Sequence, residues 1–176
     1  TVTDKADGLR KLLYINPIGR IYLINTNMNV QFTGGVITDE TLFNSLIDGE
    51  HILHNKLGNF INLYAAFDIY FKQDQDVRGL MFIPDQDVEE KQSSDSREHI
   101  LQKAVKSITA SMSSVVRDAV LPVKIVCKKF YASSEEISIF SGCDTILKNE
   151  KEGLFDYVTD GLIFTPANTG AGMHSV

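Results

Sequence analysis

A lysine, an arginine and several carboxylates lie in four short segments of this 176-residue chain. The first segment is Lys-Ala-Asp-Gly-Leu-Arg at residues 5–10. The amine of a lysine attacks phosphorus only when it is neutral, so a reactive Lys5 needs neighbours that lower its pKa or remove its proton. Gly8 lets the backbone come close to a ligand, and Arg10 is a fixed cation suited to phosphate or ribose. Asp-Gly is also a common turn, so this segment alone decides nothing.

Each of the other three segments places a carboxylate in or beside an apolar run. Residues 46–50 (Leu-Ile-Asp-Gly-Glu) begin a predicted strand, whose fixed carboxylate suits a ribose hydroxyl, although a turn before an exposed residue explains the pattern as well. Residues 63–70 (Leu-Tyr-Ala-Ala-Phe-Asp-Ile-Tyr) form an apolar strand whose phenylalanine either packs in the core or stacks on a purine. Residues 159–166 place a carboxylate at the mouth of another apolar strand.

The order of these four segments resembles that of the covalent nucleotidyltransferases, the superfamily of mRNA guanylyltransferases and ATP-dependent DNA and RNA ligases. The resemblance extends from Lys5 to Pro166. Ligases tend to carry Glu-Gly in the fourth segment, whereas Thr-Asp-Gly-Leu-Ile-Phe-Thr-Pro looks like the capping enzymes. Residues 143–147 (Cys-Asp-Thr-Ile-Leu) precede that segment and resemble the capping enzymes of large DNA viruses.

The resemblance implies a catalytic role for two residues of the chain. Lys5 would be the nucleophile that forms a phosphoamide with the GMP phosphorus and expels pyrophosphate from GTP. Asp160 would bind Mg²⁺ or Mn²⁺, directly or through water, and help to keep the Lys5 amine reactive. Asp7 and Gly8 would shape the turn that presents Lys5. Magnesium keeps several waters and needs few protein ligands, so one carboxylate together with substrate phosphates suffices.

The same resemblance implies how the nucleotide and the acceptor are bound. Arg10 and Glu50 would hold the ribose, with Arg10 also near the α-phosphate, and Phe67 would stack on guanine. The lysyl-nucleotide would then pass GMP to the 5′-diphosphate end of RNA. Splitting the transfer in this way lets one site serve two displacements.

Two other functions remain open on the sequence alone. An ATP-dependent polynucleotide ligase would use the same lysine with AMP, and no motif fixes the residues that choose guanine over adenine. A non-catalytic relative would keep the fold as an RNA-binding or subunit-binding module. The complete set of Lys5, Arg10, Glu50, Phe67 and Asp160 argues against that second alternative.

Members of this family carry a further lysine motif after the fourth segment and then an OB-fold domain, neither of which appears before Val176. We therefore expect residues 1–176 to be a single nucleotidyltransferase domain excised from a longer, multifunctional capping enzyme, and to be weak or inactive alone. In the viral proteins that it resembles, the polypeptide also carries an RNA triphosphatase and a guanine-N7 methyltransferase. The resemblance places such a protein in the cytoplasmic viral factory or the virion.

Composition narrows the remaining possibilities. The chain shows neither a membrane-spanning apolar stretch nor a secretion signal. Its net charge of −6 argues against a protein that coats nucleic acid with its whole surface, although a local basic groove is still allowed. Cys127 and Cys143 lack metal-site or disulfide spacing and are predicted to be reduced core thiols.

The pattern of apolar residues predicts an α+β fold with helices packed on antiparallel sheets. Turn residues separate two pairs of strands, and Ser96 is a good N-cap for a helix that ends before Pro122. The predicted strands span residues 10–16, 20–25, 45–54, 59–71, 123–127 and 157–165. The predicted helices span residues 97–121, with Met112, Val115 and Val116 on the apolar face, and residues 134–147, with Ile137, Phe140, Cys143, Ile146 and Leu147 buried.

Three further sets of residues receive modest interpretations. Lys124, Lys128 and Lys129 either line a groove that faces guanine or RNA phosphates or form a solvated strand face. The four histidines show no spacing typical of a metal site or a catalytic triad. Gly34 and Gly35 are predicted to form a turn and not a phosphate loop.

Overall fold

The computed structural model describes residues 1–83, 96–115, 122–134 and 136–172. The helices are α2 (Arg97–Ser111) and α3 (Ile139–Lys151), together with a short 3-10 helix at Glu40–Leu42. The strands are β1 (Val2–Ala6), β2 (Leu9–Ile15), β3 (Arg20–Asn25), β4 (Val30–Val36), β5 (Ser45–His54), β6 (Phe60–Lys72), β7 (Gln75–Asp76), β8 (Ser113–Ser114), β9 (Lys124–Cys127) and β10 (Thr159–Phe164).

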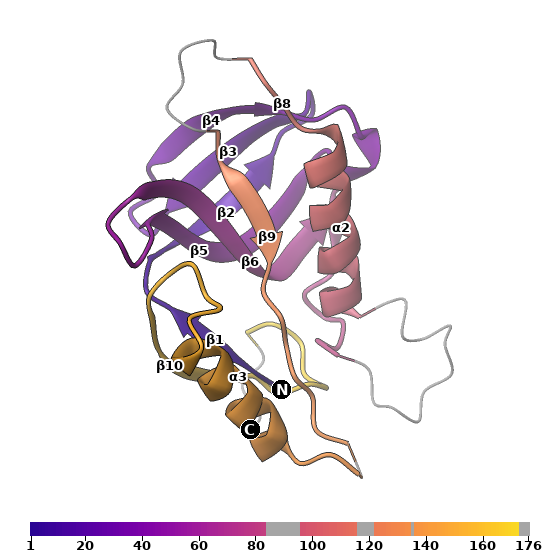
Figure 1. Cartoon of the computed structure of the whole chain (residues 1–176). Coiled ribbons are helices and arrows are strands. Elements are labelled where there is room, and N and C mark those ends of the chain that lie inside the picture. The colour runs from indigo at the N-terminus through magenta and orange to yellow at the C-terminus, as the bar shows by residue number, and fades with distance from the viewer. Residues whose placement is uncertain (84–95, 116–121, 135, 173–176) are drawn as a thin grey trace.

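These elements form two sheets, each with a helix against it (Figure 1). Within the described residues the large sheet has the strand order β7-β6-β5-β2-β3-β4-β8, and β9 also pairs with β6. Helix α2 packs against β6 and β9. The small sheet consists of β1 and β10, with α3 packed on β1. The predicted α+β class with antiparallel sheets is confirmed.

The two predicted hairpins are present. β2 pairs with β3 and β5 pairs with β6, both antiparallel, and the bounds differ from the predicted ones by no more than one residue at each end. The first turn forms because the Asn16 side chain accepts hydrogen bonds from the backbone N–H groups of Ile18 and Arg20, at 3.1 and 2.8 Å. Gly19 supplies the positive φ of 77° that this turn requires.

Strand β9 departs from the antiparallel pattern because it runs parallel to β6, with Leu63 opposite Lys124 and Ala66 opposite Cys127. A parallel neighbour requires a long crossover, and the chain makes this one through α2. The main core lies between the sheet and α2, whose Leu101, Ala104, Val105 and Ile108 are buried.

Helix α2 begins where the sequence predicted but ends earlier. The Ser96 side chain accepts a hydrogen bond from the backbone N–H of His99, and this confirms the N-cap. The helix stops at Ser111 because Met112 turns to an extended conformation and Ser113 pairs with β4. The prediction that Met112 and Val115 continue the helix is therefore wrong, and Val115 is exposed. Val116 and the end near residue 121 lie outside the described residues.

Helix α3 is shifted toward the C-terminus relative to its prediction. Its N-cap is Ser138, whose side chain accepts a hydrogen bond from Phe140 N–H, so residues 134 and 136–138 are not helical. Cys143 and Ile146 are buried against Val2, as predicted. The burial predicted for three further residues is wrong. The helix turns Phe140 and Leu147 toward solvent, and Ile137 is exposed before the helix begins.

The sequence missed four strands, namely β1, β4 and the two-residue strands β7 and β8. β1 contains Lys5, for which only a turn was predicted, and it pairs with β10 along its length. Gly34 and Gly35 lie inside β4 and not in a turn, although Gly34 adopts the positive φ of a bulge, 82°. A register shift in the pairing of β3 with β4 accommodates this conformation.

The prediction that both cysteines are reduced agrees with the structure. Cys127 and Cys143 are free thiols, and burial raises the pKa of Cys127 to about 12. Neither helix in the described part of the chain is long and apolar enough to cross a membrane.

Gly49, in the Asp-Gly-Glu segment, is required by close packing across the central strands. A Cβ at this position would lie 2.5 Å from Cζ of Tyr64 and 2.8 Å from the carbonyl oxygen of Ala65. The Tyr64 ring is fully buried, and its hydroxyl donates hydrogen bonds to the carbonyls of Lys11 and Ile47, at 2.8 and 3.1 Å. The ring therefore cannot move aside without losing these bonds.

We expect Gly49→Ala to lower the free energy of unfolding by about 1–3 kcal/mol, the usual cost of overpacking a core. Chemical denaturation measures this change. Gly79→Ala is the matched control because no atom lies within 4 Å of its added Cβ. Equal stability of the two variants would contradict this account of Gly49.

Candidate active site

The residues singled out by the sequence meet where the two sheets join. Lys5 lies on β1, Asp160 on β10 and Arg10 on β2. Glu50 lies on β5, directly opposite Arg10 in the strand pairing, and Phe67 lies on the neighbouring β6. The chain passes from the small sheet to the large sheet through residues 7–8, so Lys5 and Arg10 are held by different sheets although they are close in sequence.

Lys5 and Asp160 form a direct ion pair. The Nζ atom of Lys5 lies 2.6 Å from both carboxylate oxygens of Asp160, and each side chain is 49% exposed. The Asp160 hydrogen bond is the main cause that raises the pKa of Lys5 above its ordinary value, with smaller contributions from Asp7 and Glu50. In this ligand-free arrangement the amine is therefore protonated at neutral pH.

Gly8 allows the turn after β1 to lie against β5. A Cβ at Gly8 would be 2.9 Å from both Cγ of Glu50 and the carbonyl oxygen of His51, so no larger residue fits without displacement. Asp7 fixes the other side of the turn, since its backbone N–H donates to the Val158 carbonyl at 2.9 Å. Burial raises the pKa of Glu50, while nearby cations partly oppose this change.

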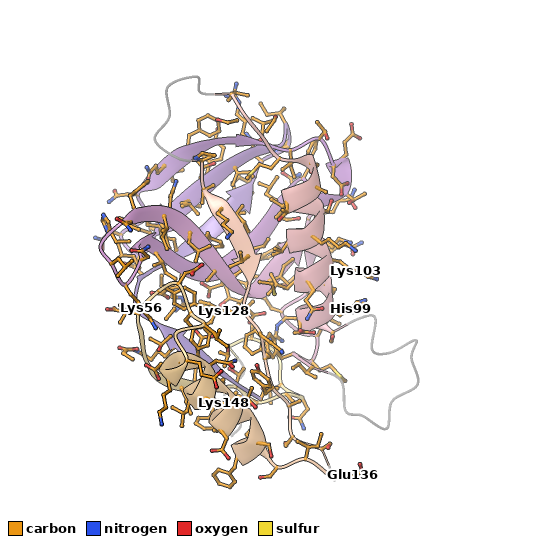
Figure 2. All side chains as sticks on the ribbon, in the orientation of Figure 1. Lys56, His99, Lys103, Lys128, Glu136 and Lys148 are labelled. Carbon is orange, nitrogen blue, oxygen red and sulfur yellow. The ribbon has the colours of Figure 1, made fainter. Side chains whose placement is uncertain are left out.

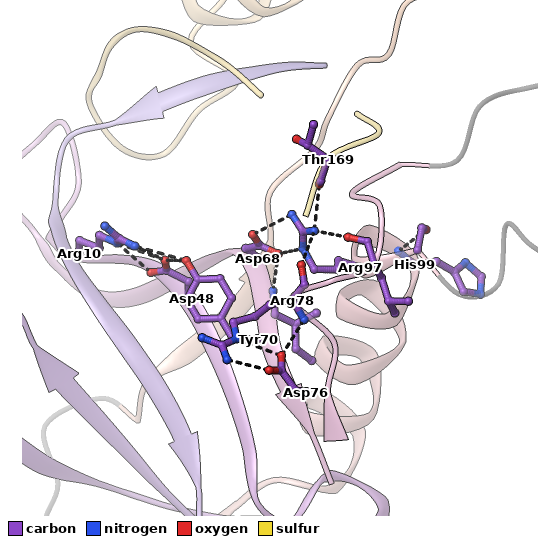
Figure 3. Close-up of polar contacts among 12 residues, drawn as sticks. Arg10, Asp48, Asp68, Tyr70, Asp76, Arg78, Arg97, His99 and Thr169 are labelled. Atoms are coloured by element: carbon purple, nitrogen blue, oxygen red, sulfur yellow. Dashed lines mark hydrogen bonds and ion pairs between the residues drawn. The ribbon is translucent and has the colours of Figure 1, made fainter. Parts of the chain in front are cut away.

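Arg10 is oriented by a buried carboxylate to which the sequence assigned no role. The guanidinium donates from Nη2 to Asp48 at 2.6 Å and from Nε at 3.1 Å, and the Tyr70 hydroxyl donates to the same carboxylate at 2.6 Å (Figure 3). Asp48 is fully buried, whereas the Arg10 side chain is 59% exposed. The edge of the guanidinium that carries Nε and Nη2 is thus fixed, and the rest of the group is open to a ligand.

Phe67 lines a cavity of about 210 Å³. Its wall is largely apolar and aromatic, with one buried lysine among the lining residues. The lining residues are Thr3, Phe67, Asp68, Phe82, Lys128, Phe130, Ile163 and Thr165. This cavity has the character of a site for a flat, mostly apolar group with a few polar edges.

Lys128 is the cation of this cavity, and neither of the two sequence-based interpretations describes it fully. It is 5% exposed and therefore belongs to no solvated strand face, unlike Lys124 and Lys129. Its ammonium donates to the backbone carbonyl of Asp4 and lies 3.2 Å from the Asp4 carboxylate. Burial lowers the pKa of Lys128, and Asp4 opposes that change. The alternation of apolar and basic residues at 123–129 was the available signal for this lysine.

The site offers few protein ligands to a divalent cation. Among the described residues, no group of three or more His, Cys, Asp or Glu side chains is arranged to hold a metal ion. The half-exposed carboxylate of Asp160 provides oxygen ligands that solvent and phosphates can share. This donor set fits Mg²⁺ or Mn²⁺, which bind carboxylate oxygen together with water and phosphate.

The fold defines a class of protein. A structure described as mycobacterial DNA ligase D complexed with ATP and MES is similar to this chain, with a TM-score of 0.51 and 11% sequence identity. The similarity covers 96% of this chain and 48% of that one, so this chain spans about half the length of the ligase structure. The shared architecture is that of the nucleotidyltransferase domain of ligases and capping enzymes.

Residues 1–173 match the family described as mRNA capping enzyme, catalytic domain, and the chain belongs to that family. No curated protein sequence matches the chain. Nucleotidyltransferases share both this family and this fold.

The Lys5–Asp160 contact predicts how the Lys5 amine titrates. Because Asp160 stabilises the charged form, Lys5 in the free protein should titrate above its ordinary pKa of about 10.5, and Asp160→Asn should lower the value. NMR titration of ¹³C-methylated lysines measures both. Asp76→Asn, which breaks the exposed ion pair with Arg78, is the control and should leave Lys5 unchanged. An unaltered Lys5 pKa in Asp160→Asn would contradict the assignment.

Proposed function

We propose that this chain is the nucleotide-transferring domain of an mRNA guanylyltransferase, in which Lys5 takes GMP from GTP and passes it to RNA. The observation that carries the proposal is the placement of the Lys5 amine 2.6 Å from Asp160, at the same junction of sheets as Arg10 and Glu50. Membership of the capping-enzyme family supports RNA capping over other nucleotidyl transfers.

The first displacement needs a neutral amine, and the geometry supplies a proton acceptor. Asp160 accepts the proton from the Lys5 ammonium through their hydrogen bond, which leaves a lone pair on Nζ. A bond then forms between Nζ and the α-phosphorus, while the bond from that phosphorus to the oxygen of the leaving pyrophosphate breaks. Arg10, fixed by Asp48, stabilises negative charge at the phosphate.

The second displacement reverses the use of Lys5. A terminal oxygen of an RNA 5′-diphosphate attacks the same phosphorus, and the bond between phosphorus and Nζ breaks. The amine regains a proton, so the enzyme returns to its starting state and the RNA carries a 5′–5′ triphosphate bridge. Through their hydrogen bond, Asp160 returns to Nζ the proton that it accepted in the first displacement.

The Asp160 carboxylate would hold a divalent cation, Mg²⁺ or Mn²⁺, directly or through water, and that ion would neutralise charge on the triphosphate. Arg10 and Glu50 hold the ribose, and their direct pairing across β2 and β5 places them side by side for that role. Gly8 lets the turn after β1 lie against β5, and the backbone of Asp7 ties that turn to Val158.

Guanine is proposed to enter the cavity beside Phe67 and to stack on its ring. Lys128 is a donor-only group with three N–H bonds, and Asp4 engages it from one side. Guanine offers the acceptors O6 and N7 on one edge, whereas adenine replaces O6 with an amino donor. A buried ammonium in this cavity therefore favours guanine, and this favours GTP over the ATP that the structurally similar ligase binds.

The wider setting is part of the same proposal. The segment at residues 143–147 and the fourth motif support an origin in a large DNA virus, with the enzyme in the cytoplasmic viral factory or the virion. The proposed polypeptide also carries triphosphatase and N7-methyltransferase modules that act before and after guanylyl transfer. Its substrates are GTP and 5′-diphosphate RNA.

Covalent labelling tests the proposed reaction. The experiment uses the protein as its gene encodes it, including any sequence on either side of these residues. We expect α-labelled GTP with Mg²⁺ or Mn²⁺ to leave an acid-labile, base-stable label on that protein. Lys5→Arg should abolish the label, and Lys124→Arg, an exposed lysine elsewhere, should retain it. Label from ATP alone would indicate a ligase, and no label from either nucleotide would indicate a non-catalytic module.

Nucleotide competition tests the role of Lys128 without altering the protein. Inosine triphosphate keeps O6 and N7, so it should compete with GTP within about threefold, whereas ATP should be weaker by about tenfold or more because it lacks the O6 acceptor. Competition for covalent labelling measures the order. If ATP competes as well as inosine triphosphate, the ammonium does not select the base.

A further inference from the structure

Arg97, the first residue of α2, is a buried cation outside all of the motifs. Its side chain is 2% exposed. A cation is disfavoured at the N-terminus of a helix, and a buried charge is costly unless it is paired and fully hydrogen-bonded. The position of Arg97 is therefore explained by its acceptors and not by the helix that carries it.

The guanidinium of Arg97 joins three segments that are distant in sequence (Figure 3). Nε donates to Oδ1 of Asp68 at 2.8 Å, and Nη2 donates to Oδ2 at 3.3 Å. Nη1 donates to the backbone carbonyl of Thr169 at 3.2 Å and also to those of Arg78 and Leu80. One planar group thus binds β6, the loop after β7 and the segment after β10.

These three segments also supply walls of the Phe67 cavity. Asp68 follows Phe67 on β6, and both line the cavity. The Arg97 guanidinium lies 5.4 Å from the centre of the Phe82 ring, another wall residue. The backbone N–H of Phe82 donates to the Ala167 carbonyl at 2.7 Å, two residues after Thr165 in the opposite wall.

We propose that Arg97 is a positioning residue that sets the width of the nucleobase cavity by holding these three walls at fixed separations. Arg97 does not line the cavity, so it acts on the base only through Phe67, Phe82 and the segment after β10. This inference rests on the proposed function, because it requires that a base enters the cavity. Lysine cannot replace the guanidinium. The single nitrogen of an ammonium group cannot donate at once to both oxygens of a carboxylate and to several backbone carbonyls, whereas the planar guanidinium can.

The proposal predicts a defect that depends on the base. In Arg97→Lys the dissociation constant for GTP should rise by about tenfold or more, because stacking requires a correctly spaced slot. The dissociation constant for ribose 5′-triphosphate, which has no base, should change by less than about twofold, since Lys5, Arg10 and Asp160 are untouched. Figure 2 draws the side chains on the whole ribbon and labels Lys128, which is one of the residues that line the cavity.

The experiment measures both dissociation constants by isothermal titration calorimetry in the same full-length protein as the labelling test. Arg78→Lys is the matched control, because it alters another arginine–aspartate pair, with Asp76, whose side chains are exposed. It should leave both constants unchanged. Thermal unfolding of each variant confirms that each protein compared is folded. If Arg97→Lys does not fold, Asp68→Asn provides a second way to break the Arg97–Asp68 contact.

Four outcomes are distinguishable. A loss confined to GTP, which disappears when Phe67→Ala is already present, supports the proposal. Equal losses of affinity for GTP and ribose 5′-triphosphate would assign Arg97 to general stability. No loss of affinity for either ligand would show that the contacts of Arg97 do not shape the cavity. If the unaltered protein binds neither ligand, the proposed function itself fails, and the inference about Arg97 fails with it.

Discussion

The close approach of the Gly8 backbone to β5 is the constraint on which the rest of the site depends. It lets a single stretch of chain leave the small sheet and enter the large one within two residues. As a result, Lys5 faces a carboxylate from β10 while Arg10 faces one from β5. A bulkier residue at Gly8 would push the two sheets apart, and Lys5 and Arg10 would no longer lie close enough to contact the same ligand.

Most of the strand architecture could be predicted from sequence because local signals are strong there. Turn residues fixed the hairpins, and β3 and β5 have the predicted bounds. The end of α2 could not be predicted, since apolar spacing continues past Ser111 and only pairing with β4 stops the helix. The parallel pairing of β9 with β6 is equally a tertiary outcome, because nothing within residues 124–127 specifies the direction of its neighbour.

The site shows the same division between local and long-range information. Motif order singled out Lys5, Arg10, Glu50, Phe67 and Asp160 as candidates, and the structure brings them to one junction of sheets. Sequence reasoning gave no role to Asp48 or Arg97, which act through contacts 38 and 29 residues away. Residues that orient others lack a spacing signature of their own, so only the folded chain identifies them.

The pairing of β1 with β10 has a consequence for how the protein is made. Lys5 and its partner Asp160 are 155 residues apart, and the two strands of their sheet are the first and the last described. Contacts between residues so far apart in sequence form late, because the chain must lose the entropy of closing a large loop before the contact contributes favourable free energy. On the ribosome, a nascent chain would leave Lys5 without this partner until nearly all of these residues had emerged. The Lys5–Asp160 pair is thus among the last contacts of the domain to form.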